Sequence, residues 1–195
     1  MTHGAPPFAA TVRLDNPAYI DPTVRIFGDV VAGEGTSFWP YSVVRSEMNG
    51  VRIGKFCNIQ DHAMIHVGAN GPTVIGDYCS ITHRVVLHGA EIGDNTLVGI
   101  GAVLMDGVKV GKNCVIAGGA FLKEGSVIPD NSVVMGLPGK VVASRDNFRQ
   151  CHRNALIYYE NALGYAEGRY DVWSDADVME RVMREVEAAA VPPGS

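Results

Sequence analysis

Aromatic side chains, basic clusters and long apolar runs are all scarce in this chain of 195 residues. Aromatic residues make up only 8% of the sequence, whereas glycine occurs 23 times. This balance favours tight turns and a core of small branched side chains. The net charge of −5 comes without a lysine or arginine cluster, which argues against nucleic-acid or anionic-membrane partners. Because no secretion signal or bilayer-spanning stretch is evident, we expect a soluble, cytoplasmic protein.

Cysteine occurs only four times and never in a C-x-x-C pair. A disulfide framework is not expected in a chain of this size without a secretion signal, so the thiols are predicted to be reduced. Cys57, Cys79 and Cys114 each occupy a small-residue position of the repeat described next. Since a free cysteine commonly packs as a small buried hydrophobe, these three are predicted to be packing residues and not nucleophiles.

A six-residue repeat dominates the chain. Aliphatic residues recur at almost every sixth position, as in Ile92, Val98, Leu104 and Val110, and a small or β-branched residue follows each one four places later. This pattern is typical of a hexapeptide-repeat β-helix, in which three hexads form one triangular coil and coils stack about 4.8 Å apart. The repeat covers about residues 11–140, and its spacing alone leaves the hand of the helix open.

The repeat is interrupted at residues 49–51, 66–74 and 89–91, where we expect loops or bulges, and it stops after Pro138. We therefore expect three parts: a β-helix domain at residues 1–140, a helical segment at residues 141–190 packing along it, and a disordered tail at residues 191–195.

Within the helical segment, residues 144–168 and 175–190 are predicted to be helices. Ser174 and Asp177 resemble a capping box that opens the second of these helices, and Val178, Val182 and Val186 lie on one of its faces.

Four of the six histidines lie between residues 62 and 88. The hexads that begin at Val44, Ile65 and Leu87 are three apart, so they stack on one face of the prism in successive coils. Their second residues, Arg45, His66 and His88, are therefore predicted to form an outward column. In that column the two imidazoles are close enough to share an ion.

His83 falls in the preceding hexad, on a different face and above Asp61. It cannot easily join the other two imidazoles within one chain, but a neighbouring chain supplies it if prisms pack around a threefold axis. Three imidazoles with one open position suit a catalytic zinc ion. A lone histidine is by itself more simply a solvated surface residue, which is our interpretation of His3 and His152, and His62 remains undecided.

These segments resemble the gamma-class carbonic anhydrase family. The stretches VVRSE, IGKFCNIQDHAMIH and ITHRVVLHG are similar, in order and spacing, to its Arg-x-Asp, Asn-x-Gln-Asp and paired-histidine elements, and NALIYY is similar to a motif of its C-terminal helix. The resemblance implies an all-β, left-handed parallel β-helix of hexapeptide repeats with C-terminal α-helices. It also implies a homotrimer that interconverts CO₂ and bicarbonate by means of a metal-bound hydroxide at each subunit interface.

The resemblance also assigns roles to residues of this chain. Zn²⁺, with Fe²⁺ or Co²⁺ as alternatives, is bound by His66 and His88 of one subunit and His83 of the next. Gln60 orients the bound water or hydroxide, and Tyr158 reaches the site from the helix. Asn58 and Asp61 support the residues around the metal. Arg45 pairs across the interface with an acid such as Asp61.

Two departures from the family pattern bear on activity. Glu47 stands where an aspartate is usual and Met48 follows it, while the loop at residues 67–73 contains no carboxylate to act as a proton shuttle. The resemblance therefore implies weak turnover. Two alternatives stay open: a non-catalytic trimeric metal-binding scaffold, and an acyltransferase that uses acyl-CoA with a histidine as general base. The transferase explains neither the histidine spacing nor the NIQD element, and the extended acceptor-binding domain that it would need is missing.

Overall fold

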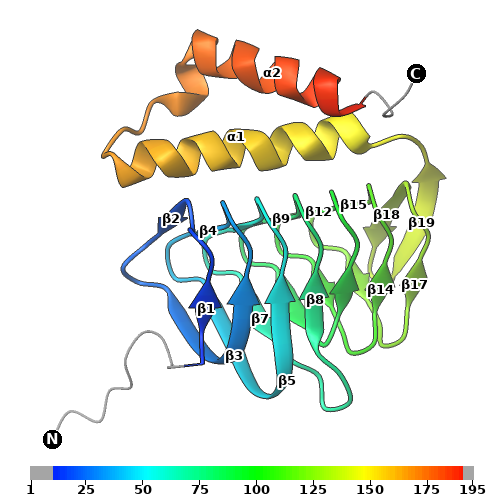
Figure 1. The fold of residues 1–195 in the computed structure, drawn as a ribbon. Helices are drawn as coiled ribbons and strands as arrows, with labels where there is room; N and C mark the ends of the chain where they lie inside the picture. The colour runs from blue at the N-terminus through cyan, green and yellow to red at the C-terminus, as the bar shows by residue number, and fades with distance from the viewer. Residues whose placement is uncertain (1–10, 191–195) are drawn as a thin grey trace, which may run out of the picture.

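The chain forms a triangular prism of short strands with two helices stacked along one side (Figure 1). The computed structural model describes residues 11–190, so the expected tail at 191–195 and His3 lie outside the described residues. All strand pairs between successive coils are parallel, in hexad register. The hexapeptide repeat thus builds a parallel β-solenoid, as predicted.

Each strand belongs to one of three faces of the prism. Faces 1 and 2 join into one sheet because β3 and β5 bend across the corner between them. Face 1 holds the first halves of β3 (Arg25–Ala32) and β5 (Val43–Ile53), with β7 (Met64–His66), β10 (Val86–His88), β13 (Val103–Leu104) and β16 (Phe121–Leu122). Face 2 holds their second halves, with β1 (Arg13–Leu14), β8 (Thr73–Ile75), β11 (Glu91–Ile92), β14 (Lys109–Val110) and β17 (Val127–Ile128).

Face 3 is a separate sheet on which the first of the two helices lies. It consists of β2 (Tyr19–Ile20), β4 (Ser37–Phe38), β6 (Asn58–Ile59), β9 (Ser80–Ile81), β12 (Leu97–Val98), β15 (Val115–Ile116), β18 (Ser132–Gly136) and β19 (Gly139–Ser144). The antiparallel strand β19, paired with β18, was not predicted, and it ends the sheet four residues beyond the expected boundary at 140. A hairpin partner of this kind breaks the hexad period, so the period alone could not indicate it.

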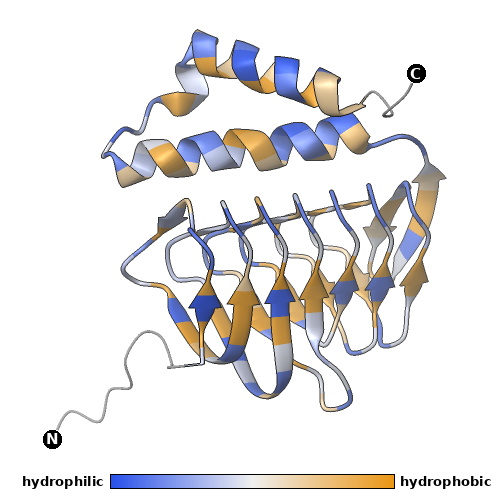
Figure 2. Cartoon of the chain, in the orientation of Figure 1, coloured by the Kyte–Doolittle hydropathy of each residue, from blue (hydrophilic) through white to orange (hydrophobic). Residues whose placement is uncertain are grey.

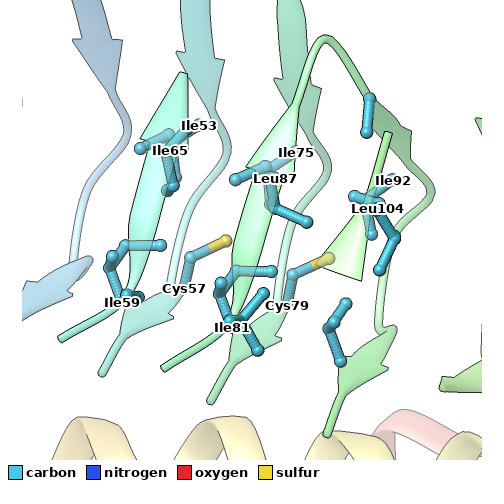
Figure 3. Packing of buried hydrophobic residues seen from close by; sticks show 14 of the residues in the cluster. Ile53, Cys57, Ile59, Ile65, Ile75, Cys79, Ile81, Leu87, Ile92 and Leu104 are labelled. Carbon is cyan, nitrogen blue, oxygen red and sulfur yellow. The ribbon is translucent and has the colours of Figure 1, made fainter. Parts of the chain in front are cut away.

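The core is a set of aliphatic ladders inside the prism. Ile59 and Ile81 stack on face 3, while Ile65 and Leu87 stack on face 1, and each is fully buried (Figure 3). Because similar aliphatic side chains stack from coil to coil, each coil removes apolar surface from water. This burial is the main favourable contribution to the free energy of folding.

The cysteines pack as predicted. Cys57 and Cys79 lie on adjacent rungs of this core (Figure 3), and all four thiols of the chain are free and buried. Burial, which disfavours the charged thiolate, raises the pKa of Cys151 to about 12 and also raises that of Cys114. Cys151 and Cys114 are therefore poor nucleophiles.

The three expected interruptions take different forms. Residues 67–72 form the loop between β7 and β8, and the connection from β10 to β11 at Gly89 is short. Residues 49–51, by contrast, lie within the continuous strand β5. The extra residues there carry the strand around the corner, with a register shift against β3 between Gly28 and Val30.

Helix α1 (Phe148–Ala166) lies along face 3, and α2 (Ala176–Ala190), after the short 3₁₀ turn η1 (Val172–Ser174), packs on α1 (Figure 1). Both helices alternate apolar and polar positions (Figure 2). Val178, Val182 and Val186 are buried on one side of α2, as predicted. Among residues 11–190, no helix combines the length and apolar character needed to cross a membrane.

The predicted capping box at Ser174 is wrong. The carboxylate of Asp175 accepts hydrogen bonds from the backbone N–H groups of Asp177 and Val178, at 3.0 and 3.2 Å. Asp175 is therefore the residue that caps α2, whereas Ser174 ends the preceding 3₁₀ turn. Because the 3₁₀ turn takes up Ser174, the next residue becomes the cap.

Candidate metal site

Face 1 carries the predicted column of polar side chains. Arg45 on β5 pairs in register with His66 on β7, which pairs with His88 on β10. The two imidazole rings lie with their centroids 4.9 Å apart. Because residues at equivalent hexad positions point the same way, this spacing follows from counting hexads, and it brings two potential metal ligands together.

His83 was expected on a different face, and it lies in the turn between β9 and β10, at the corner where face 3 meets face 1. This turn and strand β10 separate it from His88, which lies at the other edge of face 1. Within residues 11–190 there is accordingly no group of three or more histidine, cysteine or acidic side chains close enough to hold a metal ion. One chain supplies two ligands at one corner and a third at another.

Each of the three histidines contacts a carboxylate. Nδ1 of His83 lies 2.9 Å from Asp61 Oδ2, and Nδ1 of His88 lies 2.7 Å from Asp106 Oδ1. A carboxylate accepts hydrogen bonds and does not donate them, so in each neutral ring Nδ1 carries the proton and Nε2 keeps its lone pair. Nε2 of both rings is therefore the atom available to a metal.

His66 differs from the other two. Its Nε2 lies 2.9 Å from Glu47 Oε2, and Arg45 Nη1 pairs with the other oxygen of the same carboxylate. Desolvation raises the pKa of Glu47, but the hydrogen bond with His66 and the charge of Arg45 outweigh it and hold that pKa below its usual value. These side chains line a hollow of about 400 Å³ together with Met48 and the loop at residues 67–69.

Gln60 is buried, with only 1% of its surface exposed, and lies next to the corner that carries His83. Its Nε2 donates to Asn58 Oδ1 at 2.8 Å, and Asn58 Nδ2 donates to Ser80 Oγ at 3.0 Å. The carbonyl oxygen Oε1 of Gln60 is buried without a hydrogen-bond partner in the described part of the chain. Since such an atom is costly to leave unsatisfied, it marks a place where a donor is missing.

Tyr158 on α1 belongs to the His83 edge of the molecule. Its ring packs edge-on against Trp39 and Trp173, with centroids 5.7 and 5.6 Å away. Burial, followed by the negative charge of Asp61, raises the pKa of Tyr158 to about 12. The phenol is therefore neutral at physiological pH.

Two other histidines have structural roles. His62, next to Asp61, stacks flat on Tyr41 with ring centroids 5.1 Å apart. His152 was predicted to be solvated, but it lies on the buried side of α1, is only 7% exposed, and its Nδ1 contacts Asn95. The prediction was wrong because the helix face that holds His152 packs on face 3, and burial lowers the pKa of this imidazole.

Asp106 is the residue of this region that was missed from the sequence. It lies at the corner that follows β13, eighteen residues after His88, and the pairing of Leu87 with Leu104 brings the two residues together. An acidic residue one coil after a histidine was a signal in the sequence that the two side chains could meet. It was overlooked because the family elements around the histidines end at Gly89.

The parallel coils and the hexad register define this chain as a hexapeptide-repeat protein, and it carries two neighbouring histidines on one face. The model of the family described as bacterial transferase hexapeptide (six repeats) matches residues 89–124, which follow all three histidines and therefore concern the fold. Among solved structures, a hexapeptide transferase family protein from Anaplasma phagocytophilum has a TM-score of 0.76 at 29% identity, covering 82% of this chain and 96% of that one.

Two curated relatives are more specific. A protein named probable carbonic anhydrase, from Methanocaldococcus jannaschii, is 49% identical over 135 residues, which are 68% of this chain and 85% of the relative. A carbonic anhydrase from Geobacillus kaustophilus is 39% identical over 172 residues, 87% of this chain and 94% of the relative. The chain belongs to the gamma-class carbonic anhydrase family of hexapeptide-repeat proteins.

Proposed function

We propose that this protein catalyses the reversible hydration of CO₂ to bicarbonate at a metal site shared between subunits of a homotrimer. The observation that carries the proposal is that three histidines able to serve as metal ligands are divided between two edges of one face. His66 and His88 lie together at one edge, and His83 lies at the other, out of their reach. A threefold arrangement of prisms brings the two edges of neighbouring subunits together and completes a three-histidine site.

The donor set fits a divalent metal of the zinc, iron or cobalt kind. His83 and His88 present Nε2 with its lone pair, and their Nδ1 atoms are held by carboxylates, the arrangement usual for metal-binding imidazoles. Nε2 of His66 becomes available when Glu47 releases it, and Arg45 already offers that carboxylate a second partner. When bound, such a metal supplies the Lewis acidity that makes water a nucleophile near neutral pH.

The remaining residues act on the reactants. Gln60 has an unpartnered buried oxygen, and its amide is fixed by Asn58, so it can orient a water molecule without reorganising itself. Tyr158 stays protonated and offers a hydrogen-bond donor from the helix side. The hollow beside His66 and His88 has Met48 and Ala69 in its lining, and the loop that contributes Ala69 has no carboxylate. Slow proton release and weak turnover follow.

The test of this proposal is CO₂ hydration by protein loaded with zinc and, separately, with iron(II) under anaerobic conditions. We expect hydration that requires the metal: a chelator should abolish it, and reloading should restore it. A pH-indicator assay measures the rate, and the chelated protein is the blank.

Bound metal with a hydration rate equal to the blank would contradict the enzyme and favour the non-catalytic scaffold. Acetyl-CoA binding independent of metal would favour the acyltransferase. A solution mass of a monomer at micromolar concentration would contradict the shared site whatever the activity.

A further inference from the structure

Asp106 is tied to His88 although it belongs to the next coil. Its Oδ1 lies 2.7 Å from His88 Nδ1, the shortest of the three histidine–carboxylate contacts. Among residues 11–190 this carboxylate forms no ion pair with a lysine or an arginine, although other acids of the prism, such as Glu91 and Asp94, do. The imidazole is therefore the partner that fixes its position.

Two glycines make room for this carboxylate. A Cβ atom at Gly68 or at Gly89 would lie 2.5 Å from Asp106 Oδ1, closer than real Cβ atoms approach. Gly89 also has φ +62°, which favours glycine by itself. Gly68 has no such backbone requirement. A larger residue is excluded there because Asp106 and the backbone of Gly89 occupy the space that its side chain would need.

We propose that Asp106 is a positioning residue for His88 and occupies the space that Gly68 and Gly89 leave free. By accepting the Nδ1–H of His88, it keeps the proton on that nitrogen and leaves the Nε2 lone pair free for a metal. Histidine in water prefers the opposite tautomer, with the proton on Nε2, so the carboxylate reverses the default state of the ring. The value of this arrangement for metal binding rests on the proposed function, whereas the tautomer itself does not.

The tautomer is measured directly by ¹⁵N NMR of the metal-free protein at a pH where His88 is neutral. In the wild type we expect a protonated Nδ1 and a bare Nε2. In Asp106→Ala the ring should revert to a proton mainly on Nε2. Asp106→Asn keeps an acceptor oxygen and should restore the wild-type tautomer, a rescue that a merely structural role would not predict.

Zinc affinity, measured by competition with a chromogenic chelator, is the second readout. Loss of an outer partner of a metal-binding histidine typically lowers affinity about ten- to hundredfold, which is the fall expected for Asp106→Ala. Gly68→Ala should lower it as well, because it displaces the same carboxylate. Glu124→Gln is the matched control: Glu124 lines a second hollow together with Asp106, Gly68 and Gly89, so the change removes a negative charge near Asp106. Both readouts should stay at the wild-type level.

A proton on Nε2 of His88 in the wild type, or an unchanged tautomer in Asp106→Ala, would overturn the inference. Unchanged zinc affinity in Asp106→Ala, with folding confirmed by circular dichroism, would do so too. A wild-type protein that binds no zinc would contradict the proposed function, and the NMR result would still decide the role of Asp106.

Discussion

Replacing His83 with alanine is expected to abolish metal retention and CO₂ hydration while leaving the β-solenoid folded. The side chain points outward at a corner and is 39% exposed, so its loss removes little from the core. It nevertheless supplies one of three ligands to each proposed site, and two imidazoles do not make a catalytic zinc site. Metal content by elemental analysis and thermal unfolding by circular dichroism separate the two effects.

The matched control for this variant is His62→Asn. His62 lies at the same corner, has φ +57° and stacks on Tyr41, and asparagine tolerates that backbone conformation well. This variant should keep its metal and its activity. Full metal occupancy in His83→Ala, or equal losses in both variants, would exclude the site as drawn.

Substitution of Gln60 by alanine is expected to lower the hydration rate about a hundredfold with little change in metal content. The amide lies next to the ligand corner and is not itself a metal-type ligand, so binding should persist. Removal of one positioned polar group from a site of developing charge costs rates of this order. The assay compares kcat with zinc stoichiometry in the same preparation.

Some loss of stability accompanies this change because Asn58 loses the partner of its Oδ1. An unsatisfied buried acceptor costs about 1–3 kcal/mol, which thermal unfolding measures. Ser80→Ala tests the same buried network from its far end, since it removes the acceptor for Asn58 Nδ2 but leaves Gln60 in place. If Ser80→Ala slows hydration as much as Gln60→Ala does, Gln60 has no special role in orienting the reactants.

The histidine column could be predicted because counting hexads assigns each residue to a face and to a coil. Residues three hexads apart must stack, so Arg45, His66 and His88 follow from the period alone, as does the buried cysteine ladder. The carboxylate partners could not be derived in this way. They depend on which corner residues turn toward which ring, and in the case of Glu47 on one extra methylene that reaches His66.

Apart from Asp106, the parts that sequence reasoning missed lie where the period ends. The cap at Asp175 is a local contact at the start of α2. Strand β19 pairs with the last strand of face 3, and His152 packs on that face. Helical periodicity indicates which side of α1 is apolar, but not how closely the prism covers a histidine near its edge. Tertiary packing decides those positions, and no local pattern contains it.

The shared site is tested most directly by mixing two inactive variants, His83→Ala and His88→Ala, through co-expression or joint refolding. Neither variant alone should hold metal. In each mixed trimer, one of the three sites has His66 and His88 from the first variant and His83 from the second, and is intact. Random assembly of an equal mixture therefore makes about a quarter of all sites intact. Recovery of metal and hydration activity near that fraction is the predicted result, whereas a mixture that stays as empty as its components would contradict a site built between subunits.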